Sequence, residues 1–173
     1  MRTIKRLLIL LMVSSCASVQ VEYDYDRAVD FSTYKTYNYY SDLETGLSEL
    51  DTRRLLKSFD EAMSLKGLSL SSEPDFFINI SSNEYDSPNR NSVGIGVGGS
   101  GRNVGGGVSV GIPMQSRYYR QIQFDFIDED GRGLFWQAIS ESSYNPEANP
   151  EQREMNLKQI IDKVLKSYPP PKR

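Results

Sequence analysis

The stretch YYRQIQFDFIDEDGRGLFWQAI, residues 118–139, carries the clearest strand pattern in the chain. Apolar residues alternate with polar ones up to residue 127, and this period of two predicts a strand with one buried face. The Asp-Gly pair at 130–131 suits a turn, and a second apolar run follows it. In that run we expect one face to carry Leu134, Trp136 and Ala138 and the other to carry Phe135, Gln137 and Ile139. The stretch therefore predicts an antiparallel hairpin, with Trp136 in the core.

Two further strands are predicted on the N-terminal side of this hairpin. Phe76, Ile78 and Ile80 alternate with other residues, which indicates a strand over about 75–84. Residues 36–40 are rich in strand-forming aromatics, and Tyr37 and Tyr39 would share one face of a strand there. We expect these tyrosines to be half-buried strand residues rather than platforms for sugar rings.

Two amphipathic helices complete the pattern. Ser48 can cap the first, which has apolar residues at three- and four-residue spacing and ends at Gly67. Asn149 and Pro150 suit the start of the second, and Gln152 can complete its capping box. We expect the buried stripe of this second helix to consist of Leu157, Ile160, Ile161, Val164, Leu165 and Tyr168.

A glycine-rich run, residues 92–113, interrupts the strands. It contains Gly94-x-Gly96-x-x-Gly99, the spacing of a dinucleotide-binding loop. Such a loop needs a helix at its last glycine, and the glycines that follow make a helix there unfavourable. Alternating apolar residues on both sides of the run favour a β-hairpin, with a flexible loop as the alternative. We expect its tip to contact a partner through Val97, Gly99, Arg102 and Val104.

The N-terminus resembles the signal of bacterial lipoproteins. Basic residues precede the apolar run Leu7–Val13, which is too short to cross a bilayer. Val13-Ser14-Ser15-Cys16 follows and is similar to a lipobox, in which cleavage before the cysteine exposes a thiol that carries diacylglycerol. The alternative is an ordinary signal peptide with a cysteine there by chance. The lipobox predicts a processed chain of 158 residues that starts at Cys16, and its two acyl chains would suffice for stable anchoring.

Composition excludes several kinds of chemistry. The chain has no histidine and one cysteine, so it lacks the commonest general base and metal ligand. Its net charge of −3 becomes −6 after removal of three basic signal residues, which disfavours binding to nucleic acid. The Asp128-x-Asp130-Gly131 turn lacks the later ligands of a calcium loop, so we expect no metal and no cofactor.

Four segments resemble a bacterial lipoprotein family known as domain of unknown function 4136. They are the stretch from Tyr25-Asp26 to Tyr37, Lys66-Gly67 with Pro74-Asp75-Phe76, the run Gly133-Leu134-Phe135-Trp136, and the closing Tyr168-Pro169-Pro170. The resemblance implies a small α+β domain held at an envelope membrane, and it brings no catalytic residues. Ala17 lacks the aspartate that commonly retains lipoproteins in the inner membrane, which favours the outer membrane facing the periplasm.

These patterns predict a fold of the α+β class. We expect a largely antiparallel sheet of about four to six strands, two helices on one face, and a glycine-rich hairpin or loop. Residues 1–15 would be the signal peptide, 16–22 a lipidated tether, and 23–173 a single domain with the insert at 92–113.

Three functions compete on the sequence. The first is a non-enzymatic envelope lipoprotein that binds or braces another envelope component through the glycine run or the sheet face. The second is an accessory lipoprotein of an outer-membrane assembly or export machine. The third is a cell-wall enzyme with paired carboxylates among Asp24, Asp26 and Asp30. We favour the first, with the membrane as a partner through Cys16.

Overall fold

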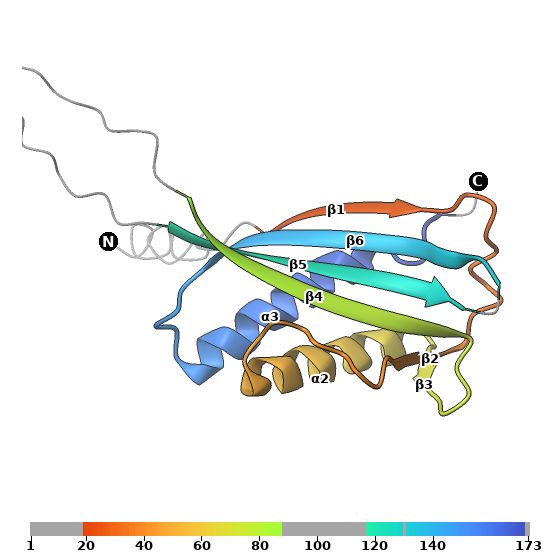
Figure 1. Ribbon diagram of the computed structural model, residues 1–173, viewed down its shortest axis with the longest axis horizontal. Coiled ribbons are helices and arrows are strands. Elements are labelled where there is room, and N and C mark those ends of the chain that lie inside the picture. Colours follow the sequence, from red (N-terminus) through yellow and green to blue (C-terminus); the bar gives the residue numbers. More distant parts are fainter. Residues whose placement is uncertain (1–18, 88–116, 130, 172–173) are drawn as a thin grey trace, which may run out of the picture.

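The computed structural model describes residues 19–87, 117–129 and 131–171. Six strands form one sheet in the spatial order β1-β6-β5-β4-β2-β3 (Figure 1). Cys16 and the predicted contact residues Val97, Gly99, Arg102 and Val104 lie outside the described residues, as does the whole glycine-rich run. The predictions made for them therefore stay predictions.

The centre of the sheet is an antiparallel meander of three twelve-residue strands, β4, β5 and β6. On one side β1 pairs antiparallel with β6, and on the other β2 pairs parallel with both β4 and β3. The mostly antiparallel α+β fold is confirmed. The strands are β1 (Gln20–Tyr25), β2 (Thr36–Tyr39), β3 (Ser69–Leu70), β4 (Phe76–Ser87), β5 (Arg117–Asp128) and β6 (Gly133–Tyr144).

Two helices, α2 (Glu49–Leu65) and α3 (Pro150–Val164), cover one face of this sheet (Figure 1). The side chain of Ser48 accepts a hydrogen bond from the backbone N–H of Asp51, so the predicted cap is confirmed. Asn149 and Gln152 form the full capping box at the start of α3. A short 3-10 turn, η2 (Leu165–Ser167), extends α3, and the predicted buried stripe of this helix is confirmed.

The core lies between the helices and the sheet. Alternate residues of β4 and β5 face it and are fully buried, as the period of two predicts. Aromatic rings supply much of its volume, and Phe59 of α2 stacks on Phe124 of β5 with centroids 5.7 Å apart. Trp136 is fully buried in the same core, as expected.

The predicted faces of β6 are wrong at its start. Between β5 and β6 the register shifts so that Phe126 pairs with Trp136 while Ile127 pairs with Leu134. Phe135 is the extra residue of a β-bulge, and the bulge turns its side chain into the core beside Trp136. Leu134, which the alternation assigns to the buried face, is 51% exposed.

Two strands have no counterpart in the prediction. Residues 20–22 were expected to belong to a tether, yet they begin β1 and pair with Glu141, Ser140 and Ile139 of β6. β3 contains two residues only, too few for a pattern to be seen. Its position follows from Gly67, whose positive φ of 81° ends α2 and turns the chain back to the sheet.

Candidate functional site

A cavity of about 530 Å³ lies where β1, α2 and η2 all end. In Figure 1 the end of β1 lies at the right-hand end of the molecule. The volume of the cavity falls within the range of small-molecule sites, roughly 300–1,000 Å³. Three chain segments supply its lining residues, which are Tyr25, Arg27, Ala28, Val29, Asp30, Phe31, Ser32, Tyr34, Lys35, Lys66, Gly67, Leu68, Tyr168, Pro169, Pro170 and Pro171.

Aromatic rings form one wall of the cavity and continue into the core. Tyr34 stacks on Phe135 with centroids 4.4 Å apart, and Phe31 meets both Phe135 and Tyr168 edge-on or tilted at 5.8 Å. The bulge in β6 therefore has a role in the site, because it places Phe135 behind two lining rings. Rings packed on both sides keep few rotamers, so this wall is preorganised.

The loop between β1 and β2 carries most of the cavity lining, and carboxylates hold this loop in place. Asp75 accepts backbone hydrogen bonds from Lys35 and Thr36 at 2.7 and 2.8 Å. Burial alone would raise the pKa of Asp75, but these bonds outweigh it and lower the pKa. Next to Lys35, at the same end of the loop, Tyr34 donates to the side chain of Asp128 at 2.9 Å. Burial, followed by this hydrogen bond, raises the pKa of Tyr34 to about 12.

Tyr168 has a hydroxyl group with no hydrogen-bond partner among the described residues. The residue as a whole is 2% exposed, but this oxygen is not fully buried and can reach solvent or a ligand. Burial raises the pKa of Tyr168, so the phenol stays protonated and can donate. Its ring packs 5.3 Å from that of Trp136, whose buried indole N–H also lacks a partner within the described part of the chain. A buried donor without a partner is rare, so the indole N–H of Trp136 makes this corner of the fold unusual.

The lining of the cavity is positively charged. It contains Arg27, Lys35 and Lys66 against the single carboxylate of Asp30, a net formal charge of +2. Among the residues that the structure describes, none of the three cations forms an ion pair within 4 Å. Asp30 accepts hydrogen bonds from the backbone and hydroxyl of Ser32. Burial lowers the pKa of Lys66.

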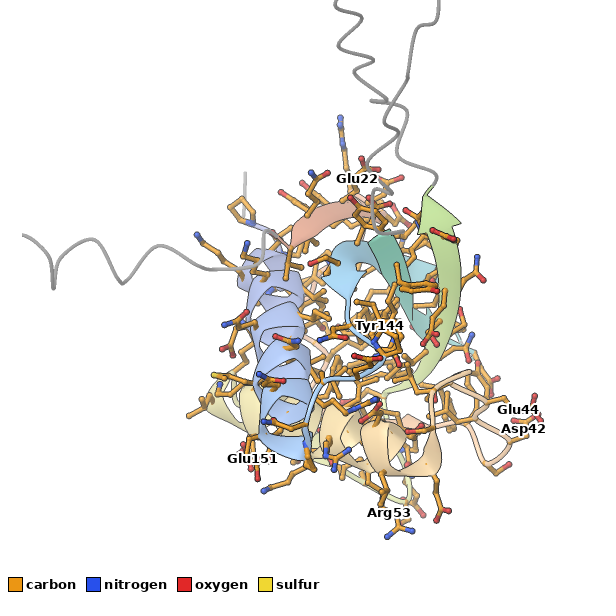
Figure 2. The ribbon with its side chains drawn as sticks, turned by 90° about the vertical axis from the view of Figure 1, so that its left-hand side faces the viewer. Glu22, Asp42, Glu44, Arg53, Tyr144 and Glu151 are labelled. Atoms are coloured by element: carbon orange, nitrogen blue, oxygen red, sulfur yellow. The ribbon has the colours of Figure 1, made fainter. Side chains whose placement is uncertain are left out.

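The opposite end of the domain holds a cluster of charges that joins the helices. Asp51 is 1% exposed and accepts hydrogen bonds from Arg54 at 2.7 Å and from Arg153 of α3 at 2.9 Å. Arg120 of β5 lies 3.7 Å above the ring centroid of Tyr144, which Figure 2 shows between the helices and the sheet. Every charge in this cluster has a partner, so we assign it a structural role.

The face of the sheet away from the helices is polar. Asp125 accepts hydrogen bonds from Gln123 and from Gln137, the latter at 2.6 Å. Tyr85 donates to Glu141 at 2.5 Å. These side chains satisfy one another, and none of them lines the cavity. The polar side chains named on this face are already paired with one another, whereas the cations of the cavity lining form no ion pair among the described residues.

The carboxylates predicted for an enzyme do not gather in the cavity. Asp24 and Asp26 accept hydrogen bonds from the backbone N–H groups of Tyr25 and Ala28, and Asp26 also meets Arg132 at 3.5 Å. Among the described carboxylates, Asp30 is the one in the lining.

Neither a metal centre nor a membrane span is found in the described ranges. No group of three or more His, Cys, Asp or Glu residues there could hold a metal ion. No helix within residues 19–87, 117–129 or 131–171 is long and apolar enough to cross a membrane.

The prediction from sequence missed the cavity as a site. The sequence nevertheless contained a signal of this site, because three of the four segments that carry the family resemblance supply the lining of the cavity. The fourth segment contains Phe135 and Trp136, which pack directly behind the lining rings.

Comparisons with known proteins agree with the fold. The family model described as "Domain of unknown function (DUF4136)" matches residues 21–170. A PDZ domain protein from Parabacteroides distasonis is similar in structure, with a TM-score of 0.56 and 16% identity over 96% of this chain and 40% of that one. The chain thus spans less than half the length of that protein. No curated protein matches the chain in sequence.

Two further solved structures are similar. One is the PelC dodecamer from Paraburkholderia phytofirmans, with a TM-score of 0.51 and 10% identity over 86% of this chain and 95% of that one. The other is a DUF4136 family protein from Bacteroides thetaiotaomicron, with a TM-score of 0.48 and 12% identity over 87% of this chain and 96% of that one. At such identities the likeness concerns the fold.

Proposed function

Because this chain belongs to the DUF4136 family, whose function is unknown, we propose its role from its own geometry. It is a non-enzymatic lipoprotein of the cell envelope, anchored through Cys16 and facing the periplasm from the outer membrane. Its folded domain binds another envelope component in the aromatic cavity. The observation that carries this proposal is the cavity itself, with its packed aromatic wall and with three cations that form no ion pair among the described residues.

A binding role fits the lining better than catalysis does. Hydrolysis of a glycosidic bond by the usual route needs two carboxyl groups on either side of the substrate. Asp30 is the one carboxylate in the described lining, and it already accepts two hydrogen bonds from Ser32. The cations and rings can hold and orient a ligand, but no described group there is placed to move a proton to and from it.

The position of the cavity also fits an anchored domain. Four residues lead from Cys16 to Gln20, a reach of at most roughly 14 Å. Lys163 of α3 donates to the carbonyl of Val19 at 2.9 Å, which holds this start of the domain in place. β1 then runs from Gln20 to Tyr25, where the cavity begins. The cavity therefore opens at the end of β1 away from the anchor, where a component from the aqueous space can reach it.

A bulky side chain placed in the cavity tests this role. Ala28→Trp adds an indole to an exposed residue of the lining, and Met155→Trp adds one to an exposed position of α3 outside the lining. The lipidated full chain and both variants are purified from envelopes, and the co-purifying proteins and small molecules are compared by mass spectrometry. We expect a component that is present with wild type and Met155→Trp and lost with Ala28→Trp. The same components in all three samples would refute a binding role for the cavity.

A second function remains open because of the likeness to the PelC dodecamer. That structure has twelve subunits, and this chain matches nearly its whole length. An accessory role in an outer-membrane assembly or export machine would accordingly predict a ring of this chain. Light scattering of the detergent-extracted lipidated protein measures its mass: a dodecamer would support this second function, and a monomer would count against it.

A further inference from the structure

We infer that the cavity takes a small molecule that carries one anionic group, a carboxylate or a phosphate, on an apolar body that contains a ring. This inference rests on the proposed function and names the chemistry of the ligand. It joins two features of the lining, an aromatic wall and an excess of positive charge.

The aromatic wall of the cavity indicates that the ligand has an apolar body. Phe31 packs against Phe135 and Tyr168, and Tyr34 stacks on Phe135, so the wall is in place without rearrangement. Pro169, Pro170 and Leu68 extend the apolar surface. A flat ring can stack on such a wall or meet it edge-on, which adds to the gain from burying its area.

The positive charges of the cavity lining indicate that the ligand carries an anionic group. Arg27, Lys35 and Lys66 line the cavity without an ion pair in the described part of the chain, although the chain as a whole has a net charge of −3. The nearby acids are engaged elsewhere, since Asp75 binds backbone N–H groups and Asp128 accepts from Tyr34. The cavity is thus a local cationic region on an acidic protein.

A cationic ligand is the main alternative, because rings can also surround an ammonium group. The carbonyl ends of α2 and η2 lie at this site and weakly favour positive charge. Three side-chain cations against one carboxylate oppose it more strongly. Lys66, placed at the C-cap of α2, already occupies the favourable position at that helix end.

The hydroxyl of Tyr168 can donate to the anionic group. A hydrogen bond to a charged partner is stronger than one between neutral groups. This hydroxyl has no hydrogen-bond partner among the described residues and is not fully buried, so a ligand in the cavity can reach it.

The test is calorimetric titration of residues 16–173 with Cys16→Ala, which is the proposed processed chain without its leader and its lipid, so that no lipid or detergent takes up the probes. The probes share one ring system: 2-naphthoate, 2-naphthyl phosphate, the neutral 2-naphthamide and the cationic 2-naphthylmethylammonium. We expect one site for the first two, binding of naphthamide at least tenfold weaker, and no binding of the cation. The tighter of the two anions identifies the carboxylate or the phosphate as the natural group.

Three variants locate the binding in the cavity. Tyr168→Phe keeps the ring and should weaken naphthoate binding roughly tenfold or more while leaving naphthamide unchanged. Lys66→Met should weaken naphthoate binding roughly fivefold. Lys158→Met removes an exposed cation of α3 that pairs with Asp162 outside the cavity, and it should change nothing. Circular dichroism confirms that each variant is folded.

Several outcomes would overturn the inference. They are equal affinity for naphthoate and naphthamide, tighter binding of the cation, no binding of any probe, or equal losses in Lys66→Met and Lys158→Met. If a component is lost in Ala28→Trp while the naphthyl anions fail to bind, the ligand chemistry is wrong and the proposed function stands. If the anions bind and no component is lost, the proposed function fails and the ligand chemistry stands.

Discussion

At the scale of single residues, Asp51 shows how a buried charge can be stabilised where two helices meet. It lies at a position where the sequence suggests the second half of a capping box. Its carboxylate instead joins Arg54 of its own helix to Arg153 of α3. Burial alone would raise its pKa, but the hydrogen bonds from the two arginines outweigh this and lower it. The folded state therefore favours the charged form of Asp51.

Asp51→Asn should lower the free energy of unfolding by roughly 2–4 kcal/mol at pH 7, because two partly buried arginines lose their counter-charge. The difference between wild type and variant should be complete above the ordinary pKa of Asp51, which is 3.8. It should shrink as the pH falls below 3.8 through the lower pKa of the folded state. Urea unfolding of both proteins between pH 2.5 and 7 measures it.

Glu49→Gln provides the control for this experiment. Glu49 pairs with Arg53 at the exposed start of α2, with both side chains more than two thirds exposed. Exposed pairs contribute about 0–1 kcal/mol, so this variant should lose little at any pH. A loss in Asp51→Asn that did not vary with pH, or that matched the loss in Glu49→Gln, would show that the buried charge is not stabilising.

At the scale of elements, the β-bulge in β6 determines which side chains reach the core. Phe135→Ala should lower the free energy of unfolding by about 3–5 kcal/mol, since it removes a fully packed ring. Leu134→Ala should change it by less than about 0.5 kcal/mol, because that side chain is half exposed. Chemical denaturation of both variants measures the two values.

Simple alternation predicts the larger loss of unfolding free energy for Leu134→Ala, whereas we expect the larger loss for Phe135→Ala. A larger loss for Leu134→Ala than for Phe135→Ala would mean that the strand has no bulge at this point. Without the bulge, Phe135 would not pack against Tyr34 and Phe31 in the wall of the cavity.

Most elements could be predicted from the sequence because their signals are local. Ser48, Asn149 and Gly67 mark helix ends through contacts within a few residues, and the alternation in β4 and β5 reports a buried face directly. The bulge could not be predicted, since it depends on the register between two strands. The alternating residues of β1 are mostly polar or exposed, so its pairing with β6 leaves no clear pattern in its own sequence.

The candidate site was harder to predict for the same reason. Its lining brings together Tyr25–Lys35, Lys66–Leu68 and Tyr168–Pro171, which are far apart in the chain. Each segment alone looks like a turn or a helix end. Only the arrangement of the sheet and the two helices shows that their rings and cations surround one cavity.

At the scale of the whole molecule, the proposed anchor residue Cys16 precedes the start of β1 in the chain, and the cavity lies at the end of this strand. The six residues of β1 span about 20 Å. A domain fixed to a bilayer just before residue 20 would hold the cavity away from the lipid surface and open to the aqueous phase. The acidic charge of the chain, −6 after processing, would also keep the domain off anionic headgroups. Both features suit a receptor for a solute better than a protein that binds its own membrane.

All of this depends on lipid at Cys16, and mass spectrometry of the N-terminal peptide tests it most directly. The full chain is expressed in a bacterium with lipoprotein processing and purified from its envelope. We predict that the first residue is Cys16 and that its peptide carries the added mass of a thioether-linked diacylglycerol. A Cys16→Ala chain should show neither cleavage before residue 16 nor added lipid. A free thiol at Cys16, or a retained leader on the wild-type chain, would contradict the account.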